Sequence, residues 1–307
     1  MLRLLGRRLL VGIVVVFLVA TAVFIATRVV SNPEKTFLPI DASPEQRVQI
    51  RSNLGLDRSV FIQYLSYLGD LVRLDLGTSY WQPGKTTVSI IMTRLPNTLL
   101  LNSAAIVLAL LIAIPLGIIA ALRPGSRLDR SAVTVSLIGL SAPQFWLAFM
   151  LVLLLGVKLQ WFPTSGFTSA QSLLLPALAL ALPAAGKITQ LTRSSMIDEM
   201  DRPYMLTAEA KGFGAIYRVV RHGLRNVTVP VLTQASFEYA RMLAGFTVVV
   251  ESIFAWPGVG LLIVQALEQQ DLILVQAIAV VVAAMIVLLN TLTDLLYTRI
   301  DPRIEAT

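Results

Sequence analysis

Residues 96–122 read PNTLLLNSAAIVLALLIAIPLGIIAAL, and this stretch decides the fold because it contains no charged side chain. A helix crosses a lipid bilayer with about 20 predominantly apolar residues. Five further stretches are predominantly apolar, at residues 9–27, 132–157, 173–191, 227–250 and 272–293. The fourth span carries Lys187 near its inner end, and the fifth is less uniform because it carries Glu238 and Arg241. The sequence therefore predicts an all-α integral membrane protein with six transmembrane helices.

The composition agrees with this prediction. Of the 307 residues, 56% are apolar and 14% are charged, whereas soluble domains carry about 45–50% and about 25%. These proportions argue against a soluble enzyme and against a disordered chain. The chain has no cysteine and a single histidine, His222, so disulfides, thiolate sites and multi-histidine metal sites are excluded. We therefore expect no metal site.

The net charge of +7 is explained by topology rather than by a nucleic-acid partner. With the N-terminus inside, basic residues collect in the segments 1–8, 123–130, 193–225 and 299–303. The two short outer loops carry only Lys158. Because cytoplasmic loops of membrane proteins are enriched in lysine and arginine, both termini are predicted to be cytoplasmic.

Three regions follow from this topology. Residues 1–30 form a basic segment and the first span, residues 31–97 an extracytoplasmic helical segment, and residues 98–307 a core of five spans. The first apolar run could also be the core of a signal peptide, cleaved near Thr21. It is too long for that, so we expect a retained helix.

The outer segment carries helix signals. Ser43-Pro44-Glu45-Gln46 is typical of a helix start and Gly55 of a helix end, and residues 61–72 repeat apolar side chains at helical spacing. Such a segment is either a cap over the outer ends of the spans or a docking surface for an extracytoplasmic partner.

The inner loop, at about residues 194–226, also has helical punctuation. Pro203 favours a short helix over 204–211 that ends at Gly212. A second short helix, 215–224, would place on one side Ile216, Val219 and Val220. Two short helices broken by glycine would form a rigid knob suited to docking a cytoplasmic protein.

Charged residues within predicted spans are costly, at about 2.5–3.5 kcal/mol near the helix centre. Glu238 and Arg241 are three residues apart and therefore share a helix face, where they can pair. They either neutralise each other at a helix contact or line a polar pathway. Lys187 and Arg193 are expected to extend toward the cytoplasmic surface.

Other sequence features indicate turns rather than catalysis. Glu251 precedes Trp256-Pro257-Gly258, which is typical of an aromatic-anchored turn and is a candidate gate, and Ser141-Ala142-Pro143 indicates a kink. Gly84-Lys85-Thr86 is not a phosphate-binding loop, because the required first glycine is replaced by Ser79. We expect no catalytic residue in this chain.

Several unusual sequence motifs occur together in this chain: LGLDRSVFIQYL, LDLGTSYW, RLPNTLLLN, IPLGIIAAL, LSAPQFWLAFML, YMLTAEAKGFG, RHGLRNVTVPVLT, VESIFAWPGVG and LLYTRIDPRI. In this order and spacing the chain resembles, over essentially its whole length, the B-type permease subunit of bacterial dipeptide/oligopeptide/nickel ABC importers. These subunits are binding-protein-dependent transport system inner membrane components.

The resemblance implies a type I ABC importer permease fold in the bacterial inner membrane. It implies half of a pathway for di- or oligopeptides that works by alternating access. The implied partners are a second homologous permease, two cytoplasmic ATPase subunits, an extracytoplasmic substrate-binding protein and membrane lipids. No cofactor is expected on this chain, since ATP and Mg²⁺ would bind the ATPase subunits.

The resemblance also assigns the inner loop as the coupling region, the EAA loop. The family pattern, E-A-A followed after three residues by glycine, falls on Leu206, Thr207 and Ala208 ahead of Gly212, so the second alanine and the glycine are kept. The implied ATPase-coupling residues are Tyr204, Thr207, Ala208, Glu209, Ala210, Lys211, Gly212, Phe213, Gly214 and Arg221. The candidate pathway or gate residues are Glu238, Arg241, Glu251, Trp256, Pro257 and Gly258.

Two alternatives stay open at this point. A permease for nickel or another small solute has the same architecture, although clustered histidines are absent. A stand-alone secondary transporter would need midplane carboxylates or broken helices. The sequence offers Glu238 and few others, and no obvious internal repeat.

Overall fold

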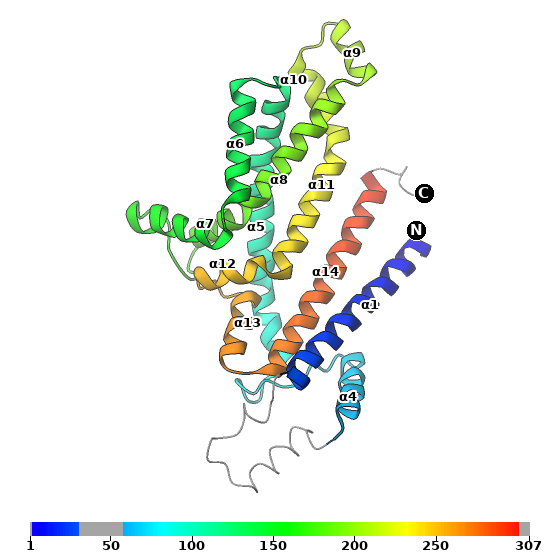
Figure 1. Cartoon of the computed structure of the whole chain (residues 1–307), viewed down its shortest axis with the longest axis vertical. Helices are drawn as coiled ribbons and strands as arrows, with labels where there is room; N and C mark the ends of the chain where they lie inside the picture. Colours follow the sequence, from blue (N-terminus) through cyan, green and yellow to red (C-terminus); the bar gives the residue numbers. More distant parts are fainter. Residues whose placement is uncertain (1, 31–57, 301–307) are drawn as a thin grey trace. The chain divides into compact units, whose positions relative to one another are not determined.

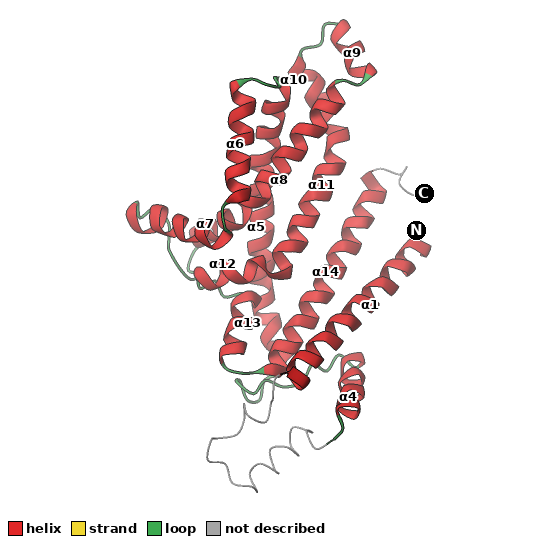
Figure 2. Cartoon of the chain, in the orientation of Figure 1, coloured by secondary structure: helices red, strands yellow, loops and turns green. Residues whose placement is uncertain are grey.

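The computed structural model describes residues 2–30 and 58–300. Over these ranges the chain is helical and has no strand, apart from an isolated β-bridge between Thr78 and Thr86 (Figure 2). The helices form two compact units, one of residues up to Pro96 with Leu261–Leu288, the other of Asn97–Gly260 with residues from Leu289 onward. The predicted helix from Ser43 to Gly55 lies outside the described residues.

The first unit holds α1 (Leu2–Ile25), the π-helical turn η1 (Ala26–Val30), α4 (Val60–Val72) and most of α14 (Leu272–Ile300) (Figure 1). The predicted helix at 61–72 is confirmed as α4. Its aromatic face packs on α1, since the Tyr64 and Tyr67 rings lie 5.2 and 5.4 Å from Phe24.

A turn in this unit, residues 75–86, is fastened to the start of α14 by Asp271. The Ser79 hydroxyl and the Trp81 N–H donate to Asp271 Oδ2 over 2.5 and 3.1 Å. The other carboxylate oxygen caps α14 by accepting from Leu274 N over 3.0 Å. One buried carboxylate therefore holds both the turn and a helix end in place.

The second unit is built around α8 (Leu174–Met200), which packs between α6 (Arg127–Ser141) and α11 (Leu224–Arg241) (Figure 1). Small residues permit this close packing. A Cβ on Gly186 would approach the Ser136 carbonyl oxygen of α6 to 2.7 Å. Helices in membranes commonly meet at such small residues, because these let the backbones approach.

Within residues 2–30 and 58–300, four helices are long and apolar enough to cross a membrane by length and composition: Leu10–Arg28, Thr87–Leu122, Ala170–Met200 and Leu272–Thr293. They coincide with the first, second, fourth and sixth predicted spans. The long helix α5 (Thr87–Leu122) contains the uncharged stretch 96–122.

The predicted third span, 132–157, is bent. It comprises α6, α7 (Gln144–Leu151) and the π-helical η2 (Val152–Lys158), and the two arms meet at 104° around Ala142 and Pro143. Proline disfavours helical backbone in the residue before it and lacks an N–H, which accounts for the break. The fifth candidate crossing is this bent pair.

The predicted fifth span, 227–250, is interrupted. The helix α11 ends at Arg241, the π-helical η5 (Met242–Phe246) contains non-helical backbone at Gly245, and α12 (Thr247–Ile253) follows. None of these pieces is both long and apolar enough to count as a crossing among the described residues. The total of six spans therefore stays a prediction.

Candidate functional site

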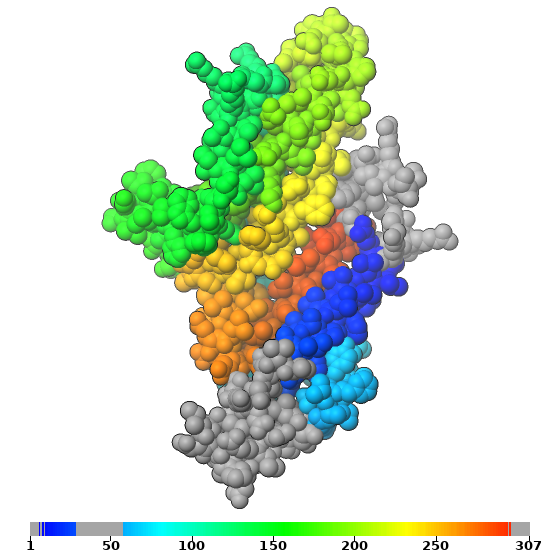
Figure 3. All heavy atoms as spheres, viewed as in Figure 1, coloured from blue at the N-terminus to red at the C-terminus, as the bar shows by residue number. Residues whose placement is uncertain are grey.

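Three parts of the second unit contain the residues selected from the sequence. The first is a knob of short helices, residues 203–223. It comprises α9 (Pro203–Ala210), α10 (Ala215–Arg218) and η4 (Val219–Gly223), as predicted, and Gly212 ends α9 with φ +85°. Figure 3 shows it in yellow-green, beyond the packed helices of its own unit.

The knob is anchored by buried apolar contacts. Met205 is fully buried, and a Cβ on Gly223 would lie 2.9 Å from Met196 Sδ and 3.1 Å from Met205 Cε. The end of α8, the start of α9 and the end of η4 therefore meet at one close-packed point.

Polar contacts around Glu199 add to this anchor. The Tyr204 hydroxyl donates to the Glu199 carboxylate, and Asn226 Nδ2 donates to Glu199 Oε1 over 2.6 Å and to the Tyr204 oxygen over 2.9 Å. One carboxylate thus joins the last turn of α8, the first turn of α9 and the beginning of α11.

An ion pair closes the knob on itself. Arg218 Nη1 and Nη2 donate to the two oxygens of Glu209 over 2.9 and 3.0 Å, and Arg218 is buried. This bidentate geometry fixes α10 against the end of α9. The sequence analysis placed Glu209 in the knob but did not identify Arg218 as its partner. The available signal was that this basic residue follows Glu209 after the two glycines, Gly212 and Gly214.

The outer face of the knob is apolar and uncovered. Ile216 and Val220 are 72% and 62% exposed, whereas Val219 is 1% exposed. The predicted common face of these three residues is therefore wrong, because Val219 packs inward. Other large apolar side chains exposed on the knob are Tyr204, Leu206, Phe213 and Tyr217. Of the predicted coupling residues all but Ala208 are exposed.

The second part is a charge cluster of Lys187, Glu238 and Arg241. Lys187 Nζ lies 3.0 Å from Glu238 Oε1, and Arg241 Nη2 lies 2.5 Å from Glu238 Oε2. Gln234 Nε2 donates to Glu238 Oε1 over 3.0 Å, and the Arg241 guanidinium stands 4.6 Å from the centre of the Phe246 ring. The predicted Glu238–Arg241 pair is confirmed.

The expectation that Lys187 and Arg193 extend to the surface is corrected. Lys187 joins Glu238, and Arg193 binds buried Asp129 through Nε and Nη2 over 2.5 and 2.8 Å. A buried carboxylate without a partner is more costly than a paired one, so each acid attracts the nearest cation on the neighbouring helix. The charge cluster keeps an excess positive charge, and its two cationic side chains are about one-third exposed, 37% and 35%.

The third part is a buried turn, residues 251–258. Glu251 is fully buried and accepts from the Thr98 hydroxyl over 2.7 Å, while the Thr98 oxygen accepts from Val259 N over 2.8 Å. A Cβ on Gly258 would overlap the Glu251 carboxylate. Glycine is therefore required at position 258 by close approach rather than by backbone angle.

Trp256 completes the packing of this turn. It is fully buried, its Nε1 donates to the Asn97 carbonyl over 3.0 Å, and its ring lies 4.4 Å from Phe167. In return Asn97 Nδ2 donates to the Pro257 carbonyl over 2.9 Å. The four predicted gate residues are thus brought together, and Asn97 and Thr98, which sequence reasoning missed, bind them to α5.

Similarity to known proteins supports the fold described above. Residues 113–306 match the family described as binding-protein-dependent transport system inner membrane component, and residues 1–102 match the N-terminal region of binding-protein-dependent transport system membrane components. The chain belongs to this family. It is a permease, a multi-pass inner membrane component of a transport system.

Individual relatives match the permease along its length. It is 37% identical over 310 residues to the oligopeptide transport system permease protein AppB of Bacillus subtilis, covering 97% of this chain and 98% of the relative. It is 34% identical over 325 residues to a protein of Brucella suis named as a peptide permease, covering 100% of both.

A solved structure shares the fold. A chain of the MetNI methionine ABC transporter in an inward-facing conformation superimposes with a TM-score of 0.60 at 15% identity. The match covers 69% of the permease and 96% of that chain. The predicted type I ABC importer permease fold is therefore confirmed.

No group of three or more metal-binding side chains occurs in the portion of the permease that the structure describes. The buried carboxylates of the three parts, Glu199, Glu238 and Glu251, instead accept hydrogen bonds or pair with cations. This arrangement suits docking, packing and charge compensation.

Proposed function

We propose that this permease forms half of the transmembrane pathway of an ATP-driven importer of di- and oligopeptides. A second, homologous permease supplies the other half. Two relatives that match over the whole length are named as oligopeptide and peptide permeases, which supports the substrate class over nickel or a stand-alone transporter. The knob is the single observation that supports the coupling role. Met205 and Val219 are buried inside it, while the described residues leave the apolar side chains of its outer face, such as Ile216, exposed.

In this proposal two cytoplasmic ATPase subunits hold ATP and Mg²⁺, and the permease itself binds no cofactor. Closure of the ATPase pair acts on the knob, and the methionine contact and the Glu199 contacts transmit the force to α8 and α11. An ATPase can shift the inward/outward equilibrium only by binding the two states with different affinity. A rigid knob suits this role, because a flexible knob could bind the ATPase equally well in both states and would then not shift the equilibrium.

The remaining partners follow from the proposed topology. Both termini and the knob are cytoplasmic, in accord with the basic residues in 193–225. A substrate-binding protein docks on the extracytoplasmic side. The charge cluster lines the pathway, because cations partly exposed at membrane depth are expected to face a water-filled cavity or a protein partner rather than lipid. The turn at 251–258 is the proposed gate.

Mass spectrometry of what copurifies with the tagged permease in mild detergent tests this proposal. Wild type is expected to bring a second permease and the ATPases in stoichiometric amounts. Ile216→Asp is expected to lower ATPase recovery at least tenfold, because exposed anchors carry most binding energy, while the yield of inserted permease stays unchanged.

A control is Arg225→Ala, which changes an exposed charged residue of α11 two positions beyond the knob and outside the implied coupling residues. It is expected to retain ATPase. A permease that purifies alone and still drives uptake from an ion gradient would overturn the proposal. Full ATPase recovery with Ile216→Asp would remove the assignment of the apolar face.

A further inference from the structure

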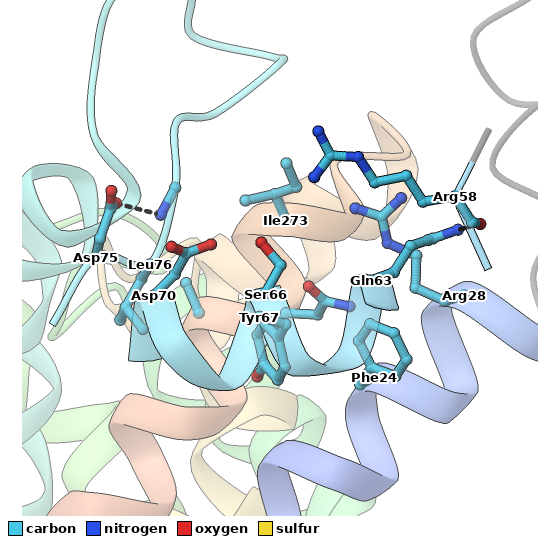
Figure 4. A pocket seen from close by; sticks show the side chains of 13 residues that line it. Phe24, Arg28, Arg58, Gln63, Ser66, Tyr67, Asp70, Asp75, Leu76 and Ile273 are labelled. Atoms are coloured by element: carbon cyan, nitrogen blue, oxygen red, sulfur yellow. Dashed lines mark hydrogen bonds between the residues drawn. The ribbon is translucent and has the colours of Figure 1, made fainter. Parts of the chain in front are cut away.

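The first unit contains a cavity of about 240 Å³ that none of the three parts above involves. Its walls come from the end of α1, the inner face of α4, the turn at 75–77 and the first turns of α14 (Figure 4). Ligand pockets for drug-sized molecules measure about 300–1,000 Å³. This cavity therefore suits a smaller molecule.

The charges around the cavity are separated by sign. Arg28 and Arg58 lie at one end, beside Gln63, and Asp70 and Asp75 lie at the other (Figure 4). Among the described residues no carboxylate pairs with either arginine and no cation pairs with Asp70; Asp75 Oδ1 accepts from Gly77 N over 2.9 Å. Arg28 is half-buried, and a guanidinium removed from water favours an anion as its neighbour.

Between the two charged ends the wall is largely apolar. Phe24 and Tyr67 are stacked at 5.4 Å, and Ile273 and Ala277 of α14 complete this part. The Tyr67 hydroxyl is buried and has no hydrogen-bond partner among the described residues. Burial raises the pKa of Tyr67 to about 12, with a smaller contribution from Tyr64, so the hydroxyl stays protonated in the cell.

Hydrogen bonds at the margin of the cavity fix its walls relative to one another. Asp271 fixes the turn at 75–86 to α14, and Gln276 Nε2 donates to the Thr27 hydroxyl between α14 and α1. A framework fixed in this way keeps the acidic and basic ends from collapsing onto each other. It also lowers the ordering cost when a ligand binds.

We propose that this cavity binds a small zwitterion, with its carboxylate at Arg28 and Arg58 and its ammonium group at Asp70 and Asp75. A phosphate or another simple anion would leave the acidic end unused, and a simple cation would leave the basic end unused. A short peptide with free termini, or a free amino acid, uses both ends. The choice of a short peptide rests on the proposed function.

Binding to the assembled complex in lipid nanodiscs, without the substrate-binding protein, tests the proposal by calorimetry. The probes are Ala-Ala, N-acetyl-Ala-Ala, Ala-Ala amide and free alanine. Ala-Ala is expected to bind at least tenfold more tightly than either blocked peptide, since each block removes one charge. If alanine binds as tightly as Ala-Ala, the ligand is a free amino acid and the peptide assignment fails.

Two variants locate the binding to this cavity. In Arg28→Gln, Ala-Ala is expected to bind no more tightly than Ala-Ala amide but still more tightly than N-acetyl-Ala-Ala. In Asp70→Asn, Ala-Ala is expected to bind no more tightly than N-acetyl-Ala-Ala but still more tightly than Ala-Ala amide. Arg73→Gln, which changes an exposed residue at the end of α4 outside the cavity, is the control and should retain both preferences for Ala-Ala. Thermal melting of each complex confirms that the fold is intact.

The outcomes separate this inference from the proposed function. If Ala-Ala still binds more tightly than both blocked peptides in Arg28→Gln and in Asp70→Asn, the cavity assignment is overturned even if the complex imports peptides. Discrimination that each variant removes as expected supports the cavity even if ATP-driven uptake of peptides is absent, in which case the proposed function fails.

Discussion

The knob at 203–223 and the buried turn at 251–258 are both short connections in the second unit that contain aromatic residues and glycine. They differ in where their large apolar side chains lie, buried in the turn and exposed on the knob. In the turn, Trp256 is fully buried and its ring N–H is bonded within the chain. In the knob, Ile216 and Val220 point outward while Met205 and Val219 hold the knob together. The large aromatic side chain of the turn is thus covered, whereas the knob presents large apolar side chains that no other described part of the chain covers.

The first test replaces two threonines by isosteric valine: Thr98 of α5, which holds the turn, and Thr207 of the knob. Thr98→Val leaves the buried Glu251 carboxylate short of a donor and the Val259 N–H without its acceptor. Each loss costs about 1–3 kcal/mol, so the free energy of unfolding is expected to fall by about 3 kcal/mol. Unfolding in a graded series of sodium dodecyl sulfate concentrations measures this.

Thr207→Val in the knob is the matched control. The Thr207 hydroxyl is exposed and bonds only to the Pro203 carbonyl one turn before it, so a change within about 0.5 kcal/mol is expected. Equal losses in the two variants would contradict the distinction between a sealed turn and an open knob.

The second test adds one methyl group to each region. Gly258→Ala places a Cβ against the Glu251 carboxylate and forces the turn to shift, with an expected loss of about 2 kcal/mol. Gly214→Ala adds a Cβ that meets nothing within 4 Å and should leave the melting temperature of the permease unchanged. A tolerated Gly258→Ala would show that the turn is looser than its contacts indicate.

The third test concerns the backbone of the knob and has the smallest expected effect on the free energy of unfolding. Gly212 has φ +85° and open space around its Cβ position, so Gly212→Ala costs about 1 kcal/mol through left-handed backbone alone. Gly212→Pro cannot adopt this φ. ATP-driven uptake by proteoliposomes is expected to be reduced by the alanine and abolished by the proline, with normal membrane insertion in both; normal uptake by the proline variant would remove the coupling role of this break.

Much of this architecture is local and was therefore accessible from the sequence. The start of α9 at Pro203, its end at Gly212 and the Glu238–Arg241 pair all depend on neighbours within four residues. The contacts that sequence reasoning missed join helices far apart in the chain. Examples are Lys187 with Glu238 and Thr98 with Glu251.

The two expectations that failed share one physical reason. Both Arg193 and Val219 were assigned by their place along one helix, but each is controlled by another element. Arg193 pairs with Asp129 of α6, and Val219 is packed inward against the core. Helical periodicity gives the direction of a side chain and cannot tell which helix lies opposite it.

The 104° bend around Pro143 has a consequence for the sidedness of everything after it. Each crossing takes the chain to the other side of the membrane. Whether the number of preceding crossings is even or odd therefore determines the side on which a loop lies. If the bent pair returned to the face it entered from, six basic residues would emerge outside: Arg193, Arg202, Lys211, Arg218, Arg221 and Arg225. The retention of positive charge in the cytoplasm opposes that outcome. It therefore favours the prediction that the two arms together make one crossing of the membrane.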